Sequence, residues 1–124
     1  MPFRTLWMLY FDDTRIIEMK SPAAIDALSA LANEHRLAIY RLLVQAGREG
    51  RAAGAIADKL ELPASSLSFH LAHLNRAGLI EQRRESRSLI YSADFAVMNG
   101  LVGFLTENCC GGASCAPVAK RKAS

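Results

Sequence analysis

Apolar residues recur at helical spacing in four stretches between residues 21 and 77. The first stretch begins at Ser21, which is a good N-cap residue and is followed by a proline that suits the first helical turn. The apolar residues that recur at a helical period in this stretch are Ile25, Leu28, Leu31 and Ala32. Three further helices are predicted over residues 35–46, 53–60 and 64–77. Gly47 ends the first of these three helices and Gly78 ends the third.

The spacing changes to that of strands after Gly78. Residues 79–84 and 88–92 are predicted to be two strands around a polar turn. Asp94 is then placed to cap a last helix over residues 95–108. The predicted order of elements is therefore four helices, a β-hairpin and one last helix.

The third and fourth helices are short and joined by a tight turn, which is the helix-turn-helix pattern. A hairpin directly after the second of the pair corresponds to a wing. The segment before the pair, residues 48–51, is predicted to be a polar loop. The fold class is thus mainly α with a β-hairpin wing, a winged helix-turn-helix.

The helix over residues 64–77 has two different faces. Leu67, Leu71 and Leu74 form a core stripe, and the rest of its surface holds no acidic residue. A carboxylate facing phosphates would be repelled, so this composition suits DNA better than an ordinary solvated face does. The groups predicted to reach phosphates, base edges or thymine methyls are those of Ser65, Ser66, Ser68, Phe69, His70, His73 and Arg76.

Two of these residues have an alternative place. His70 lies at the margin of the core stripe and could be a buried, hydrogen-bonded histidine, and Phe69 could pack against a neighbouring segment. The predicted hairpin adds Arg83, Arg84 and Arg87, which suit phosphate contact or insertion into the minor groove. The alternative for these arginines is a charged cluster that keeps an edge strand soluble.

Length and charge add little to this picture but exclude some classes. The chain has 124 residues, a net charge of +3 and no apolar run as long as a membrane span, so we expect one cytoplasmic domain and no membrane partner. We divide it into an extension over residues 1–20, the winged domain over 21–108 and a tail over 109–124. The chain lacks a Cys-x-x-Cys motif and a zincin motif, which argues against an enzyme.

The hairpin and the helix before it resemble those of the ArsR/SmtB family of metal-sensing repressors. The similar residues are Ser65-Ser66-Leu67-Ser68-Phe69-His70, then Leu71-x-x-Leu74-x-x-Ala77-Gly78-Leu79-Ile80, and Leu31-x-x-x-His35-Arg36-Leu37-x-Ile39 earlier in the chain. The resemblance covers about residues 21–110 and leaves the first 20 residues without a counterpart. It implies a homodimer joined by the first and last helices, which binds a palindromic DNA operator.

Three cysteines follow the last helix in the pattern CC-x4-C, at Cys109, Cys110 and Cys115. The sequence lacks the cysteine pair that many arsenic-responsive relatives carry near the third helix, and resembles instead the branch with a C-terminal sensor. Trivalent arsenic prefers three soft thiolates, and no fourth ligand lies nearby in sequence. We therefore expect arsenite, a related arsenical or antimonite to act as inducer.

Other ligand chemistries remain open for the tail. Zinc or cadmium would need a fourth ligand, which His35 could supply in space. The cysteines could also form a disulfide in a DNA-binding redox sensor, or be exposed thiols at a frayed end. The predicted function is a transcriptional repressor that leaves its operator when trivalent arsenic binds.

Overall fold

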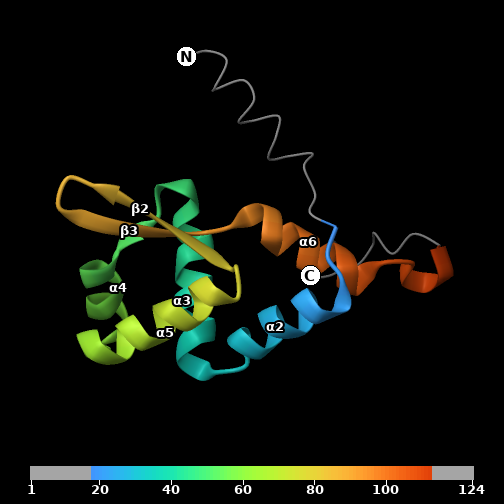
Figure 1. The fold of residues 1–124 in the computed structure, drawn as a ribbon, viewed down its shortest axis with the longest axis horizontal. Coiled ribbons are helices and arrows are strands. Elements are labelled where there is room, and N and C mark those ends of the chain that lie inside the picture. Colours follow the sequence, from blue (N-terminus) through green and yellow to red (C-terminus); the bar gives the residue numbers. More distant parts are fainter. Residues whose placement is uncertain (1–17, 113–124) are drawn as a thin grey trace, which may run out of the picture.

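The structure, a computed structural model, describes residues 18–112. Its elements in chain order are α2 (Ser21–Leu31), α3 (Glu34–Ala46), the 3-10 helix η1 (Gly47–Glu49), β1 (Arg51–Ala52), α4 (Ala53–Leu60), α5 (Ala64–Arg76), β2 (Ile80–Glu85), β3 (Ser88–Ala93), α6 (Phe95–Thr106) and η2 (Cys109–Gly112). Figure 1 shows α4, α5 and the β2–β3 hairpin in one half of the molecule, and α2 and α6 in the other. The order and type of these elements confirm the predicted winged helix-turn-helix.

Side-chain caps explain where two of the helices begin. Asn33 precedes α3 and its side chain accepts hydrogen bonds from the backbone N–H groups of His35 and Arg36, at 2.9 and 3.0 Å. Asp94 caps α6 in the same way, as predicted. The N-cap predicted at Ser21 is wrong, because Lys20 occupies that position without a side-chain bond and Ser21 is the first helical residue.

The predicted loop over residues 48–51 is only partly a loop. Gly47–Glu49 form the single turn η1, and Arg51 begins a two-residue strand that pairs antiparallel with β3. The sheet therefore has three strands in the order β1–β3–β2. The hairpin strands lie close to their predicted ranges, and Glu85 pairs with Ser88 across a two-residue turn.

One core joins these elements. Its largest fully buried side chains are those of Ile39, Leu43, Ile56, Leu74 and Leu79. The predicted stripe of α5 is confirmed, since Leu67, Leu71 and Leu74 are all buried. The turn between α4 and α5 is tight because Glu61 adopts a left-handed conformation (φ 53°) that ends α4.

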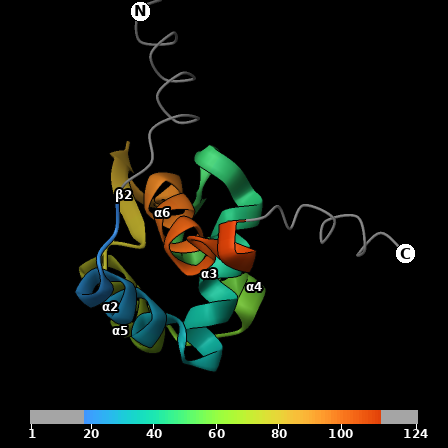
Figure 2. The same ribbon diagram turned by 90° about the vertical axis from the view of Figure 1, so that its right-hand side faces the viewer.

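The apolar residues that recur at helical spacing in α2 do not make up its buried face. The buried residues are Ala24, Ala27 and Ala30, whereas Ile25 is 62% and Leu28 is 41% exposed. Small side chains let α2 lie close against α3 and α5, so Ile25 and Leu28 point away from the protomer's own core, and Leu31 packs at its edge. Figure 2, which looks along the long axis, shows α2 and α6 together at the end away from the wing.

Candidate nucleic-acid interface and cysteine site

The outer face of α5 is open to solvent, as a DNA-contacting face must be. Ser65, Ser68, Phe69 and Arg76 are exposed, and the phenyl ring of Phe69 is left uncovered by the rest of the chain, at 63% exposure. Ser66 and His73 are half-buried beside them. The alternative in which Phe69 packs into a neighbouring segment therefore does not hold for the described residues, although its ring edge contacts the adjacent His70.

His70 lies partly inside, against the start of α3. Its Nδ1 is 3.4 Å from Nη1 of Arg36, and its ring centroid is 5.6 Å from that of His35. Arginine is always a donor, so Nδ1 accepts and the ring is neutral in this pairing. Partial burial, and then the positive charge of Arg36, lower the pKa of His70. One face of this imidazole is thus occupied by α3, which leaves less of it for DNA than the prediction assumed.

His73, one turn later on α5, has a different neighbourhood. Its pKa is lowered first by partial burial and then by the positive charges of Arg36 and Arg76. Both causes disfavour the charged ring in the protein without DNA. The imidazole can donate or accept a hydrogen bond at a base edge.

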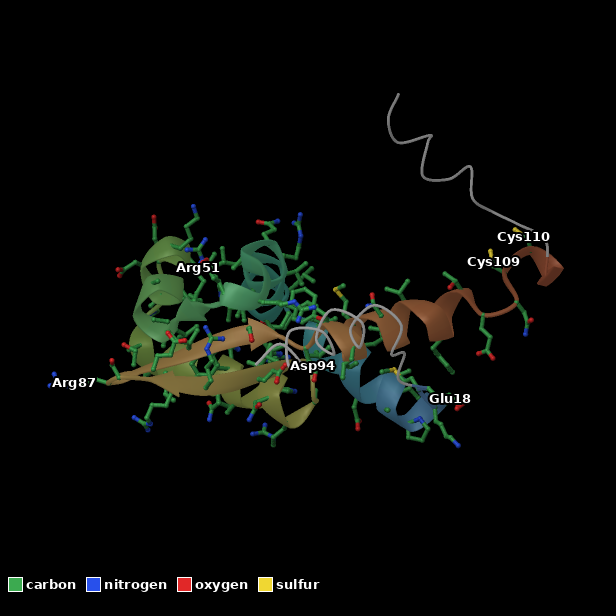
Figure 3. The ribbon with its side chains drawn as sticks, turned by 90° about the horizontal axis from the view of Figure 1, so that it is seen from above. Glu18, Arg51, Arg87, Asp94, Cys109 and Cys110 are labelled. Atoms are coloured by element: carbon green, nitrogen blue, oxygen red, sulfur yellow. The ribbon has the colours of Figure 1, made fainter. Side chains whose placement is uncertain are left out.

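The wing arginines divide into two kinds. Arg87 occupies the hairpin turn and projects from the far end of the molecule, as Figure 3 shows. Arg84 is exposed on β2, and within the described residues the structure gives neither of these two an ion pair. Arg83 instead donates to Glu85 and to two backbone carbonyls. Two of the three predicted wing arginines are therefore placed as open cationic groups, and the third is engaged within the protein.

The cysteines lie at the opposite end from Arg87 (Figure 3). Sγ of Cys109 is 3.6 Å from Sγ of Cys110, close to the separation of about 3.8 Å for two sulfurs bound tetrahedrally at about 2.3 Å. Cys115 lies outside the described residues, so the predicted three-sulfur site is not seen as a whole.

The structure offers no complete metal site among residues 18–112, where no group of three or more His, Cys, Asp or Glu side chains is placed to hold an ion. His35, the predicted alternative fourth ligand, lies beside His70 on α5. Figure 1 shows the start of α3 and the η2 segment well apart. The zinc or cadmium alternative therefore gains no support from this histidine.

The sequence did not single out two features of the site. Arg36 joins α3 to α5 and donates from Nε to the carbonyl oxygen of Ala30 at 2.7 Å, which also ties it to α2. The second feature is a set of exposed apolar residues on two helices that contact each other, which we call the α2–α6 surface: Ile25, Leu28, Val102 and Leu105. These are the first and last helices of the winged domain, through which the family resemblance implied dimerisation.

Comparisons with known proteins agree with this architecture. A family model described as a helix-turn-helix domain matches residues 31–83. The transcriptional activator HlyU of Vibrio cholerae is 33% identical over 94 residues, which cover 76% of this chain and 84% of that protein. The nodulation protein NolR of Rhizobium meliloti is 38% identical over 80 residues, or 64% of this chain and 63% of that protein.

Solved structures give the same result. The structure of Vibrio cholerae HlyU matches with a TM-score of 0.57 at 35% identity, covering 72% of this chain and 97% of that one. A homodimeric winged helix-turn-helix DNA-binding domain from Mycobacterium bovis, described as a possible ArsR-family regulator, matches with a TM-score of 0.56 at 32% identity. That match covers 74% of this chain and 85% of that one. An ArsR-like regulator from Rhodococcus matches with a TM-score of 0.63 at 26% identity, covering 83% of this chain and 89% of that one.

The fold, the open face of α5 and these relatives define a winged helix-turn-helix transcription regulator that binds DNA, and not an enzyme. The chain belongs to the ArsR/SmtB family. None of the helices in the described part of the chain combines the length and apolarity that a membrane crossing requires.

Proposed function

We propose that this protein is a homodimeric, cytoplasmic transcriptional repressor that binds a palindromic operator and releases it when trivalent arsenic binds Cys109, Cys110 and Cys115. One observation carries the DNA-binding part of the proposal. The acid-free, exposed face belongs to α5, and the open arginines Arg84 and Arg87 belong to the β2–β3 hairpin. Figure 1 shows α5 and this hairpin in the same half of the molecule, so one duplex can meet both.

The dimer is supported by the α2–α6 surface. Ile25, Leu28, Val102 and Leu105 are 41–62% exposed and lie on two helices that contact each other within one protomer. Exposed apolar groups gathered on one surface mark an interaction site. A two-fold axis through this surface would place two α5 helices on one face of DNA, and the Mycobacterium bovis relative is described as homodimeric.

The proposed sensor acts from a distance. Cys109 begins η2, three residues after α6 ends at Thr106, and Figure 3 shows both described cysteines at the opposite end of the molecule from Arg87. Because α6 contacts α2, and α2 contacts α5, a shift of α6 at the dimer surface can change the placement of the two α5 helices. Coupling of about 1–3 kcal/mol between ligand and operator is usual and would relieve repression several-fold or more.

The experiment is a titration of the reduced dimer, bound to a labelled duplex that the wild-type protein selects from a random pool. Arsenite is expected to release the duplex, with antimonite, zinc and cadmium as comparison ions. Cys109→Ser should bind the duplex as the wild type does and lose the release by arsenite. Release that persists in Cys109→Ser would overturn the proposed ligand set.

A second function, a thiol redox sensor, is favoured by one observation, the 3.6 Å separation between Sγ of Cys109 and Sγ of Cys110. A sulfur held in a disulfide cannot bind arsenic until it is reduced, so the two mechanisms exclude each other at these residues. Under the redox function hydrogen peroxide should release the duplex from the wild type, whereas arsenite should have no effect.

A further inference from the structure

Arg83 makes contacts that neither of its neighbours in the wing makes. Nε donates to Oε2 of Glu85 at 2.9 Å, Nη2 donates to the carbonyl oxygen of Glu49 at 2.9 Å, and Nη1 donates to that of Arg48 at 3.4 Å. All three nitrogens of one guanidinium therefore have partners inside the protein. Two of these partners belong to a segment 34 and 35 residues earlier in the chain.

The register shows what these bonds span. Ala52 of β1 pairs with Ile90 of β3, and Ile90 pairs with Arg83 of β2. Since β3 lies between the other two strands, the Arg83 side chain reaches across β3 to the segment that leads into β1. Gly50 packs that segment against β3 so closely that a Cβ would meet Ile90 and Ser92 at 3.1 Å, which fixes the two carbonyls over the sheet.

The row formed by Ala52, Ile90 and Arg83 is the last one of the sheet in which β1 takes part. Beyond Ala52, Ile90 and Arg83, the hairpin continues only as the pairs Arg84–Leu89 and Glu85–Ser88 and the turn that holds Arg87. A two-stranded hairpin is marginally stable by itself. Arg83 thus ties the wing to the helical body at the row where the sheet narrows from three strands to two.

We infer that Arg83 is a positioning residue, which fixes the direction of the wing so that Arg84 and Arg87 can reach DNA, and does not act mainly as a phosphate contact. The inference rests on the proposed DNA-binding function. A planar guanidinium can donate to three separated acceptors at once, whereas a lysine ammonium keeps the charge but cannot span them. This difference between geometry and charge makes the inference testable.

The test compares two neighbouring arginines in the full-length dimer. Arg83→Lys, Arg83→Gln, Arg84→Gln and the control Arg41→Lys are each titrated, over a series of KCl concentrations, against the duplex that the wild-type protein selects from a random pool. We expect both Arg83 variants to weaken binding about tenfold, as loss of a charge-assisted hydrogen bond does. Arg84→Gln should weaken binding and lower the salt slope, whereas Arg41→Lys, at an exposed position of α3 outside the proposed DNA contacts, should bind as the wild type does.

Two further measurements separate positioning from a general loss of stability. Hydrogen exchange of the wing amides without DNA should be faster in Arg83→Lys and unchanged in Arg84→Gln. In a background that already carries Arg84→Gln and Arg87→Gln, Arg83→Lys should cause no additional loss of DNA binding, because the groups that it positions are gone.

The outcomes distinguish the inference from the function on which it rests. Wild-type affinity of Arg83→Lys, together with weak binding of Arg83→Gln, would show that the charge alone matters and would overturn the inference while leaving DNA binding intact. Additive losses in the Arg84→Gln, Arg87→Gln background would overturn it as well. Failure of the wild-type dimer to select any duplex would overturn the proposed function itself, and the inference with it.

Discussion

Arg36 and His70 connect two helices of the DNA-binding half, with Nη1 of Arg36 3.4 Å from Nδ1 of His70. The same guanidinium donates from Nε to the carbonyl oxygen of Ala30, at the end of α2. One side chain on α3 therefore touches both a helix of the proposed dimer surface and the helix proposed to read DNA. This places Arg36 on the route by which a change at the dimer surface can reach α5.

Arg36→Gln is expected to lower the free energy of unfolding by about 1–3 kcal/mol, because it removes hydrogen bonds made by a charged, half-buried group. Urea denaturation followed by circular dichroism measures this change. Arg41→Gln is the matched control, since Arg41 lies exposed on the same helix. Equal stability of the two variants would mean that the Arg36 contacts contribute nothing in solution.

Tyr40 gives a prediction about alkaline pH. Its hydroxyl is buried without a hydrogen-bond partner in the described part of the chain, and burial, followed by the nearby charge of Asp94, raises its pKa from 10.0 to about 12. The unfolded chain then loses this proton at lower pH than the folded protein does, so stability is fully present below pH 10 and falls between about pH 10 and 12.

Tyr40→Phe removes both the orphaned hydroxyl and its titration. We expect the variant to be as stable as the wild type or slightly more stable at neutral pH, because a buried polar group without a partner is costly. Its stability should also decline less between pH 10 and 12. A loss of more than about 1 kcal/mol at neutral pH would instead show that the hydroxyl has a partner, such as a bound water.

Val102 tests the α2–α6 surface. It is 53% exposed in the protomer, and the proposal buries it between two subunits. Val102→Glu should convert the dimer to monomers because it would bury an unpaired carboxylate, whereas Val102→Ala should leave most of the protein dimeric. Sedimentation velocity of both variants measures this difference, and a dimeric Val102→Glu would move the interface elsewhere.

Leu74 and Phe69 lie on opposite faces of α5, so their replacement by alanine should affect different properties, stability for Leu74 and DNA binding for Phe69. Leu74 is fully buried, so Leu74→Ala is expected to cost about 2–5 kcal/mol of stability. Phe69 is 63% exposed, so Phe69→Ala should change stability little and weaken binding to the selected duplex. Thermal unfolding and DNA titration of each variant decide this, and a large loss of stability in Phe69→Ala would place that ring in a packing role.

Apolar spacing located the buried face of α5 but not that of α2, for one physical reason. Leu67, Leu71 and Leu74 are large and meet the protomer's own core, so size and direction agree. In α2 the inward face carries only alanines, while Ile25 is exposed. Periodicity identifies an apolar face but does not say whether the same chain or a second copy covers it.

The wing shows a second limit of the sequence. The three arginines look equivalent along the chain, yet only Arg83 finds backbone carbonyl acceptors, which come from residues 34 and 35 positions away. The strand β1 was also missed, because two residues are too few to show an alternating pattern. Contacts of this kind depend on tertiary arrangement, whereas the capping by Asp94 was readable because donor and acceptor are three residues apart or fewer.

The most direct test of the account is a titration of the selected duplex with wild-type, Arg76→Ala and Arg84→Ala dimers at increasing KCl concentrations. The account predicts tight binding by the wild type that falls steeply with salt, and a slope that is shallower by about 0.9 for each phosphate contact that a substitution removes. Wild-type binding no tighter than to a scrambled duplex, or slopes unchanged in both variants, would contradict the proposed DNA interface.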